Sequence, residues 1–335
     1  MRLLFAGTPE MAVPSLYRLA ARFEVVGVLT APDRRKGRKR GPQPSPVKAA
    51  AESLGLPVMQ PPRLNGDARA QVQAVAPDLL VVVAYGRIFG PRFMALFPHG
   101  GVNLHPSLLP RHRGPSPIPA AILAGDSETG ITVQQVAPEM DSGDILAQQR
   151  IPLTGTETTA SLTDRVAREG AVLLEEVVAA IVAGTAIPVP QDHDVASYCR
   201  LIEKSDGRVD WTTSAAHIER MSRAFNPWPG TYTYLDGRQL TLWETSVYPA
   251  GADPAGQDPT VAAGVGAENA PGGGSGRRSA PGPGQVLGVD KAHGILVQTG
   301  DGVLAVRRLQ LQSRGATDWK SFLNGVHGFI GCTLE

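Results

Sequence analysis

Residues 78–85 read DLLVVVAY, and residues 101–105, the next strand candidate, read GVNLH. The first segment is a continuous apolar run, as expected for a strand of a parallel sheet that helices cover on both faces. It is far shorter than the roughly 20 residues that are needed to cross a membrane. We therefore expect these two segments to form the centre of an α/β sheet.

Strand and helix patterns alternate around this centre. Ser45 before Pro46 marks one helix start, because serine is a favoured N-cap and proline a favoured first helical residue. The alternation is typical of a doubly wound, mostly parallel sheet, whose ligands lie beyond the carboxyl ends of the strands. We expect strands at 2–6, 24–30 and 57–60, helices at 11–21, 46–54 and 68–75, a hairpin at 130–136 and 145–151, and a long helix at 161–182.

A second, β-rich block follows. One helix and five short strands separated by turns favour a small barrel of the oligonucleotide-binding (OB) type. We expect the helix at 214–224 and the strands at 231–235, 239–244, 284–289, 295–299 and 303–311. The expected domains are 1–183 and 205–335, joined by a linker at 184–204, with a flexible insertion at 249–283 that is dominated by Gly, Pro, Ala and Ser.

The composition limits the class of protein. The chain has 335 residues, 42% of them hydrophobic, and a formal net charge of +1. These values fit two globular domains and exclude a uniformly basic nucleic-acid coat. Cys199 and Cys332 form no CxxC pair, so we expect neither a disulfide framework nor a metal site. No signal-peptide or membrane-span pattern is present, which favours a cytoplasmic protein.

Polar side chains end the strand at 101–105. Asn103 and His105 point to the same face, because side chains of a strand alternate. An amide beside an imidazole suits the polarisation of a carbonyl or the binding of an oxyanion. Asp141, in the turn MDSGD, is the candidate carboxylate that would raise the pKa of the imidazole and fix its tautomer. A purely structural role, closing a strand and shaping a turn, is equally compatible with the spacing.

A basic segment follows the second expected strand. Residues 33–48, DRRKGRKRGPQPSPVK, contain seven Lys or Arg and one acidic residue, in a chain whose total charge is +1. Such a run is often a solvated loop, but here it leaves the rim where the candidate site lies. We expect it to bind nucleic-acid phosphates, with an affinity that falls as salt is added. The second block adds weaker basic candidates: Arg307, Arg308, Arg314 and Lys320.

The same motifs, in this order, resemble the methionyl-tRNA formyltransferase family, over almost the whole chain. The strand-end NxH, the SLLP that follows it and the downstream DxGD are shared by formyltetrahydrofolate-using transformylases in general. The TAPDR and PSPVK segments and RAFNPWPG are more particular to the tRNA enzymes. The matching stretches are FAGTPE, TAPDRRKGRKRGPQPSPVK, VVVAYGRI, NLHPSLLPRHRGPSPI, DSETGITV, MDSGDIL, DGRVDW and RAFNPWPG.

The resemblance implies a folate-binding catalytic domain and an OB-like domain that contacts tRNA. It further implies transfer of a formyl group from 10-formyltetrahydrofolate to initiator methionyl-tRNA by a cytoplasmic monomer that needs no metal. Asn103, His105 and Asp141 match the catalytic trio of the family. The positions that match its tetrahydrofolate contacts are Ser107, Leu108, Leu109 and Pro110, and those that match its acceptor-stem loop are Lys36, Arg38, Lys39 and Arg40.

The sequence departs from the family at two places, and other functions compete. The insertion is longer than the family's usual connection, and QSRGATDWKSFLNG replaces a GKK-M-type sequence near the C-terminus. A formyltransferase acting on a ribonucleotide amine or an amino sugar would share the trio but would not need the basic segment. A non-catalytic RNA-binding protein on the same scaffold would not need the trio. A nicotinamide oxidoreductase is disfavoured because FAGTPE lacks the glycines of GxGxxG.

Overall fold

The computed structural model describes residues 1–35, 41–249 and 280–335. The chain divides into two units, Met1–Leu201 and Ile202–Glu335. Most of the insertion that we expected at 249–283 lies outside the described residues.

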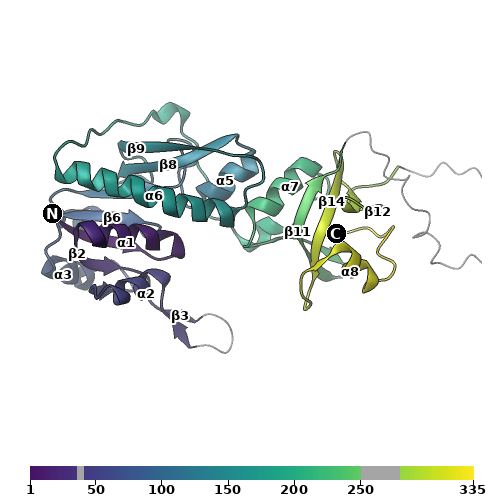
Figure 1. Cartoon of the computed structure of the whole chain (residues 1–335), viewed down its shortest axis with the longest axis horizontal. Helices are drawn as coiled ribbons and strands as arrows, with labels where there is room; N and C mark the ends of the chain where they lie inside the picture. Colours follow the sequence, from purple (N-terminus) through teal and green to yellow (C-terminus); the bar gives the residue numbers. More distant parts are fainter. Residues whose placement is uncertain (36–40, 250–279) are drawn as a thin grey trace, which may run out of the picture. The chain divides into compact units, whose positions relative to one another are not determined.

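The first unit is built on a seven-stranded sheet of order β5-β2-β1-β6-β7-β8-β9 (Figure 1). The pairs from β5 to β7 are parallel, whereas β8 is antiparallel to both β7 and β9. This order confirms the expected doubly wound, mostly parallel sheet. The strands are β1 (Arg2–Gly7), β2 (Glu24–Leu29), β5 (Val58–Met59), β6 (Leu79–Val83), β7 (Gly101–His105), β8 (Glu128–Gln135) and β9 (Ile145–Pro152).

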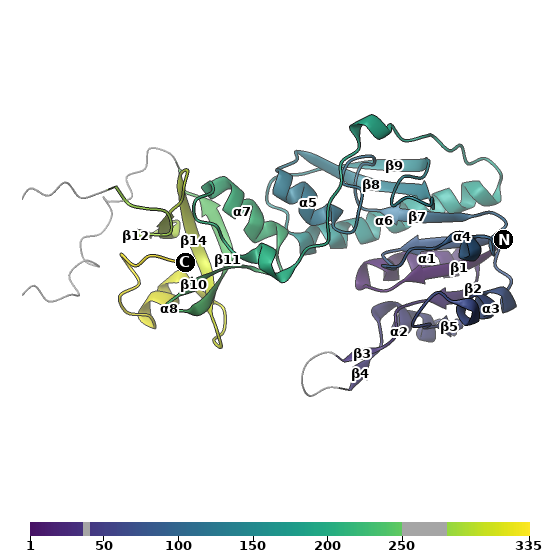
Figure 2. The ribbon, with the colours of Figure 1, turned by 180° about the vertical axis from the view of Figure 1, so that it is seen from behind.

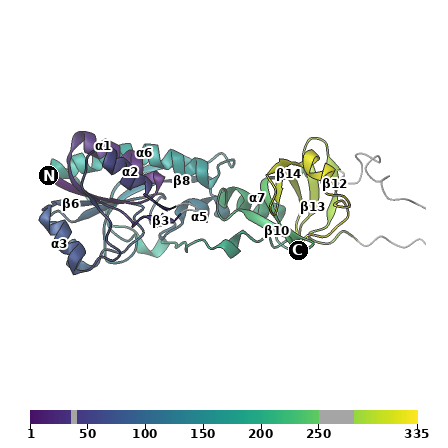
Figure 3. The same ribbon diagram turned by 90° about the horizontal axis from the view of Figure 1, so that it is seen from below.

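Helices cover both faces of this sheet (Figures 2 and 3). On one face lie α1 (Val13–Arg22), α2 (Pro46–Ser53) and α6 (Thr159–Val182), and on the other lies α3 (Gly66–Ala74). The helix α4 (Pro91–Met94) shares a core cluster with α3, so it covers the same face. All five residues of β6 are therefore buried, as its apolar run predicts. The predicted N-cap is confirmed, since the Ser45 hydroxyl accepts a hydrogen bond from the Lys48 amide at 3.0 Å.

Three helices were not expected: α4, α5 and α8 (Trp319–Asn324), of which α5 is the longest. The helix α5 (Pro117–Ala124) begins at a proline and ends at Gly125, which has a φ of 71°. Its sequence, PIPAAILA, is apolar on every side and contains two prolines, so it shows no amphipathic period. Proline is tolerated there because the first turn of a helix has no internal partners for its amides. Short elements complete the unit: η1 (Glu10–Ala12), β3 (Arg34–Arg35), β4 (Pro42–Gln43) and η2 (His193–Val195).

Residues 184–201, most of the expected linker, belong to the first unit. Val189 exchanges two main-chain hydrogen bonds with Ile145 at the start of β9. Further along, the Arg113 amide donates to the Ser197 carbonyl at 2.8 Å, and the Cys199 amide donates to the Arg113 carbonyl at 2.8 Å. The segment therefore pairs with the loops at the edge of the sheet.

The second unit is an antiparallel sheet that curls around one apolar core (Figure 3). Its strand order is β10-β11-β14-β13-β12, with β15 paired to β14, and the five predicted strands and the predicted helix are confirmed with ends shifted by a few residues. The elements are η3 (Lys204–Gly207), α7 (Ala215–Ala224), β10 (Thr231–Leu235), β11 (Arg238–Val247), β12 (Val286–Asp290), β13 (Gly294–Gln298), β14 (Val303–Leu311), β15 (Thr317–Asp318) and α8 (Trp319–Asn324).

Within residues 1–35, 41–249 and 280–335, every helix is too short or too polar to span a membrane.

The packing of β8 leads to a stability prediction. A methyl group on Gly130 would collide with the main-chain oxygen of Gln149 on β9 and with the side chain of Leu108. Gly130→Ala should therefore lower the free energy of unfolding by about 1–3 kcal/mol, the usual cost of overpacking. Urea unfolding followed by circular dichroism measures this change.

Gly66→Ala is the matched control for that substitution. At Gly66, the first residue of α3, a methyl group meets only the Arg69 side chain, at 3.8 Å. The control should be neutral or stabilising by up to about 1 kcal/mol. Equal midpoints for the two variants would contradict the packing of β8.

Candidate active site

The strand β7 carries the first two residues of the candidate site. Asn103 and His105 lie at its carboxyl end, opposite Gln134 and Thr132 of β8 in the antiparallel register. His105 is buried, with 4% of its surface exposed, and Asn103 is partly buried. The sheet edge predicted to hold the site therefore presents both side chains from one rigid strand.

Asp141 lies beside them, in the turn that follows β8. Its Oδ1 is 3.4 Å from the Asn103 Nδ2 and accepts a 2.9 Å hydrogen bond from the Gln134 Nε2. Its Oδ2 accepts a 2.8 Å hydrogen bond from the Gly114 amide. The turn is tight, with a φ of 53° at Asp141, and a side chain at Gly143 would collide with the carbonyl of Gln135. The structure thus brings together the three residues of the predicted trio.

The imidazole of His105 has two different neighbours. Its Nε2 donates a hydrogen bond to the His112 carbonyl at 2.9 Å, and its Nδ1 lies 3.5 Å from the Asp141 Oδ1. Because the carbonyl can only accept, it fixes the tautomer that carries hydrogen on Nε2. In the neutral ring the Nδ1 lone pair therefore faces Asp141.

Asp141 acts on His105 in the predicted direction but does not decide the pKa of the ring. The carboxylate favours the charged imidazole, as expected, but burial of the ring outweighs it and lowers the pKa of His105 below the ordinary value of 6.5. Burial penalises the charged form because the protein interior solvates an ion less well than water does. The lowered pKa favours the neutral ring of His105 in the free protein, and the main chain of His112, rather than Asp141, sets its tautomer.

Hydrogen bonds hold the loop after β7 in the position where the His112 carbonyl contacts His105. The His112 amide donates to the Ser197 hydroxyl at 2.9 Å, and its ring Nε2 donates to Asp126 at 2.7 Å. Asp126 also accepts a 2.6 Å hydrogen bond from Arg111. His112 has a φ of 56°, a conformation that needs such support.

The segment predicted to contact tetrahydrofolate forms the first part of this loop. The Thr132 hydroxyl donates to the Ser107 carbonyl at 2.7 Å and accepts from the Leu109 amide at 3.2 Å. Gln148 donates to the Leu109 carbonyl at 2.8 Å. Leu108 and Pro110 are partly exposed, whereas Ser107 and Leu109 are buried. The segment is thus tied to β8 and β9 by its main chain.

Two residues that hold the Asp141 turn in place, Arg113 and Gln191, were not singled out in the sequence. The guanidinium of Arg113 is buried, and its Nε and Nη2 donate to the Gln191 Oε1 at 3.1 and 2.7 Å. The Gln191 amide in turn donates to the carbonyls of Asp141 and Gly143 at 2.9 and 2.7 Å. Gln191 thus links the buried arginine to the Asp141 turn. Its only sequence signal was its place in a segment that has no periodic pattern.

The end of β6 contributes unused groups to the same sheet edge. The Tyr85 hydroxyl is buried and has no hydrogen-bond partner among the described residues, and burial raises its pKa. The loop that follows exposes 74% of Ile88. The Tyr85 hydroxyl is thus a buried polar group that the described residues leave unsatisfied.

The predicted phosphate-binding residues cannot be placed. Lys36, Arg38, Lys39 and Arg40 lie outside the described residues. The residues on either side of them, β3 and β4, form a two-stranded antiparallel ribbon. The segment is anchored at Asp33, which accepts hydrogen bonds from Lys48 at 2.8 Å and from Gln60 at 2.7 Å.

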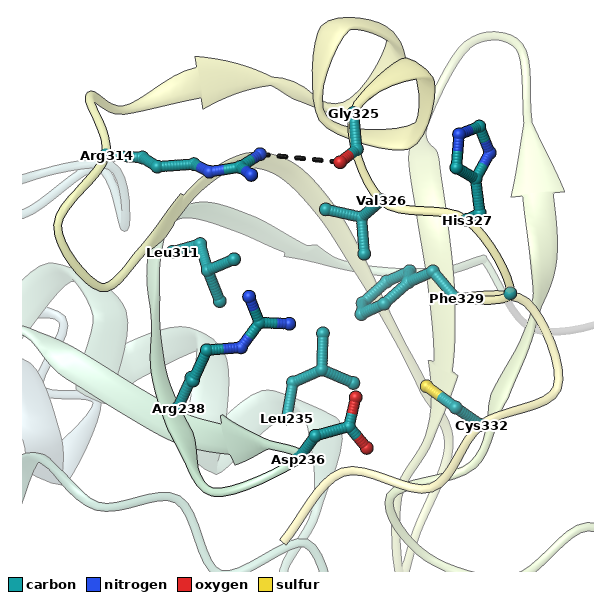
Figure 4. Close-up of a pocket in the computed structure, with 11 residues that line it drawn as sticks. Leu235, Asp236, Arg238, Leu311, Arg314, Gly325, Val326, His327, Phe329 and Cys332 are labelled. Atoms are coloured by element: carbon teal, nitrogen blue, oxygen red, sulfur yellow. Dashed lines mark hydrogen bonds between the residues drawn. The ribbon is translucent and has the colours of Figure 1, made fainter.

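The second unit contains a pocket of about 260 Å³ (Figure 4). Leu235, Leu311 and Phe329 line its apolar floor, and the side chains of Arg238 and Arg314 extend over it. Of the weaker basic candidates, Arg314 thus lines this pocket, where its Nη1 lies 3.4 Å from the Gly325 carbonyl. Arg307 instead donates to the Ala292 carbonyl, and Lys320 lies over the Trp319 ring; Arg308 is exposed on β14.

The side chains that commonly bind metal ions are dispersed in the described structure. In the part of the chain that the structure describes, no three His, Cys, Asp or Glu side chains are grouped so that they could hold a metal ion.

Comparison with known proteins defines the class. Residues 3–178 match the formyl transferase model, and residues 201–327 match the model of the formyl transferase C-terminal domain. The chain therefore belongs to the formyl transferase family, which confirms the resemblance noted in the sequence. A solved sugar 3N-formyl transferase, WlaRD, shares the fold, with a TM-score of 0.62 at 14% identity over 94% of this chain and 99% of that chain.

Relatives with higher sequence identity indicate which kind of formyl transferase the chain resembles. A methionyl-tRNA formyltransferase of Treponema denticola is 41% identical, over 98% of this chain and 98% of the relative. A methionyl-tRNA formyltransferase of Treponema pallidum (strain Nichols) is 44% identical, over 97% of this chain and 96% of the relative. The similarity thus covers both units rather than the catalytic half alone.

The two opposing effects on His105 give a prediction. Asp141→Asn removes the charge that favours the imidazolium but leaves burial unchanged, so the pKa of His105 should fall further below 6.5. Nuclear magnetic resonance titration of histidine-labelled protein measures this pKa, and His105→Asn assigns the signal by its loss. An unchanged or raised pKa would contradict the electrostatic contact between Asp141 and His105.

Proposed function

We propose that the protein transfers the formyl group of 10-formyltetrahydrofolate to the α-amino group of methionine on initiator methionyl-tRNA. The observation that carries this proposal is the full-length similarity to methionyl-tRNA formyltransferases, at 41–44% identity through both units. Enzymes that formylate ribonucleotide amines or amino sugars share the catalytic fold, but this full-length similarity favours the tRNA substrate.

We assign the folate co-substrate to the edge of the sheet. Tetrahydrofolic acid is bound by a solved protein of the same fold, HypX of Aquifex aeolicus, at 17% identity and a TM-score of 0.57. In the present protein we assign its binding to Ser107, Leu108, Leu109 and Pro110, with the free hydroxyl of Tyr85 as a further polar group. When bound, the co-substrate supplies the formyl carbon beside Asn103 and His105.

The amide of Asn103 and the ring of His105 then act on different atoms of the two substrates. The methionine nitrogen forms a bond to the formyl carbon, and negative charge develops on the formyl oxygen. Asn103 donates a hydrogen bond to this oxygen; removal of one such donor typically costs about 2.7–4 kcal/mol of transition-state stabilisation. The neutral Nδ1 of His105 accepts the proton that the amine must lose.

Asp141 completes the proton transfer. Once His105 is charged, the carboxylate 3.5 Å from its Nδ1 stabilises the imidazolium. The imidazolium adds to the stabilisation of the formyl oxygen and returns its proton, directly or through water, to the departing N10 atom as the bond between N10 and the formyl carbon breaks. No covalent enzyme intermediate is needed, because the amine is itself the nucleophile.

Binding of tRNA is assigned to the basic segment and to the second unit. Lys36, Arg38, Lys39 and Arg40 are the proposed contacts to the acceptor stem, so affinity should fall as salt is added. We further expect a monomer that acts in the cytoplasm, where its substrates are used in translation initiation.

Formyl transfer should occur with initiator methionyl-tRNA and fail with elongator methionyl-tRNA. Radiolabelled 10-formyltetrahydrofolate and the two charged tRNAs form a paired assay. Labelling of neither tRNA by folded protein would overturn the proposed substrate, and labelling of both would overturn the proposed discrimination.

The proposed role of Asn103 predicts a defect in turnover. Asn103→Ala should lower kcat about 10²–10³-fold, because one donor to the developing charge is lost. Asp141→Asn should lower kcat and shift the pH optimum. The control Asn324→Ala changes an exposed amide on α8 and should leave kcat unchanged. Normal turnover of the Asn103 variant would exclude this role.

A further inference from the structure

Tyr198 is the most exposed aromatic side chain among the described residues, with 68% of its surface open to solvent. It lies in the segment that pairs with the loop after β7, and the mechanism proposed above does not use it. A large exposed ring costs hydrophobic free energy, so an exposed ring beside an active site is a candidate contact surface for a ligand.

The ring is held in place despite its exposure. The Arg113 Nη1 donates to the Tyr198 hydroxyl at 3.0 Å, and the Arg113 Cζ lies 5.7 Å from the ring centroid. Arg113 is itself only 1% exposed, and its other nitrogens donate to Gln191 and to the His193 Nδ1. The buried guanidinium therefore holds the ring through its hydroxyl, while 68% of the residue remains exposed.

Main-chain hydrogen bonds also fix the backbone on both sides of Tyr198. Arg113 is paired with Ser197 and Cys199, the two neighbours of Tyr198. A ligand that stacks on this ring would therefore pay little entropy for ordering it. The guanidinium cation, whose Cζ lies 5.7 Å from the ring centroid, also draws electron density from the ring, which favours stacking on an electron-rich base.

Hydrogen bonds connect the neighbours of Tyr198 to the turn that carries Asp141. Gly114, the residue after Arg113, donates its amide to the Asp141 carboxylate at 2.8 Å. Gln191, the partner of Arg113, donates to the Asp141 carbonyl at 2.9 Å. Arg113 and Gln191 thus connect the ring to the Asp141 turn through successive hydrogen bonds.

We propose that Tyr198 is the stacking surface for the 3′-terminal nucleobase of the aminoacylated RNA and that Arg113 is the residue that positions its ring. The inference rests on the proposed function. The methionine is esterified to the ribose of this last nucleotide. The base must therefore lie near the site when the amine reacts. A nucleobase stacks on an aromatic ring with little sequence preference, which suits a terminal nucleotide that all tRNAs share.

Fluorescence tests the contact without formyl transfer. An uncharged tRNA with 2-aminopurine in place of the terminal adenine should lose fluorescence when it binds the full chain, because stacking quenches this base. Tyr198→Ala should abolish the quenching, and Tyr198→Trp should preserve it. Tyr17→Ala, which removes another exposed tyrosine of the first unit, is the control and should behave like the unmodified protein. Equal quenching by Tyr198→Ala would overturn the inference.

Tyr198→Phe tests the positioning role of Arg113. The ring remains but the hydroxyl that receives the 3.0 Å hydrogen bond is lost. The variant should still quench 2-aminopurine but bind the tRNA more weakly than the unmodified protein. Equal affinity would remove Arg113 from the proposal.

Kinetics separate this inference from the proposed function. Tyr198→Ala should raise the KM for methionyl-tRNA about tenfold, within the range of one lost base–aromatic stack, with little change in the KM for 10-formyltetrahydrofolate. A rise confined to the folate KM would mean that the ring contacts the pterin, and the inference would be wrong. If the unmodified protein formylates initiator methionyl-tRNA but the variant matches it in KM, the inference falls and the proposed function stands. If the unmodified protein formylates neither tRNA, both fall.

Discussion

The carboxylate of Asp141 is the interaction on which the edge of the first sheet depends. It contacts or accepts hydrogen bonds from three different elements, through Asn103 of β7, Gln134 of β8 and the amide of Gly114. A partly buried charge is costly unless it is hydrogen-bonded, so these donors and the carboxylate require one another. The turn at Asp141 therefore locks the relative positions of two strands and a loop, and the imidazole of His105 is oriented within that frame.

Much of the fold follows from local sequence patterns, and the exceptions have physical causes. The run at β6 and the N-cap at Ser45 are visible because burial on two faces and helix capping leave local signals. The pairing of Arg113 with Gln191 is not visible in the sequence, since the two residues are 78 positions apart and meet only through tertiary structure. The lowered pKa of His105 was missed for the same reason: the sequence shows the neighbouring carboxylate but not the depth of burial.

Some motifs that identify the family have a structural role in the second unit. Trp211 of DGRVDW is buried in the core, and its indole nitrogen donates to the Thr233 hydroxyl at 3.0 Å. In RAFNPWPG, the Gly230 amide donates to the Phe225 carbonyl at 2.8 Å and so closes the turn between α7 and β10. In this chain these residues therefore form the core of the second unit and one of its turns. A recognisable motif is thus not necessarily a substrate contact.

The first unit includes residues 184–201, most of the segment that the sequence suggested to be a linker. Without Gln191, the buried guanidinium of Arg113 would lose the acceptor for two of its hydrogen bonds, and the carbonyls of Asp141 and Gly143 would lose a shared donor. Ser197 likewise holds the amide of His112, whose carbonyl fixes the tautomer of His105. Because unmade hydrogen bonds of buried groups cost about 1–3 kcal/mol each, a first unit that ended at residue 183 would keep its strands but lose the geometry of its site.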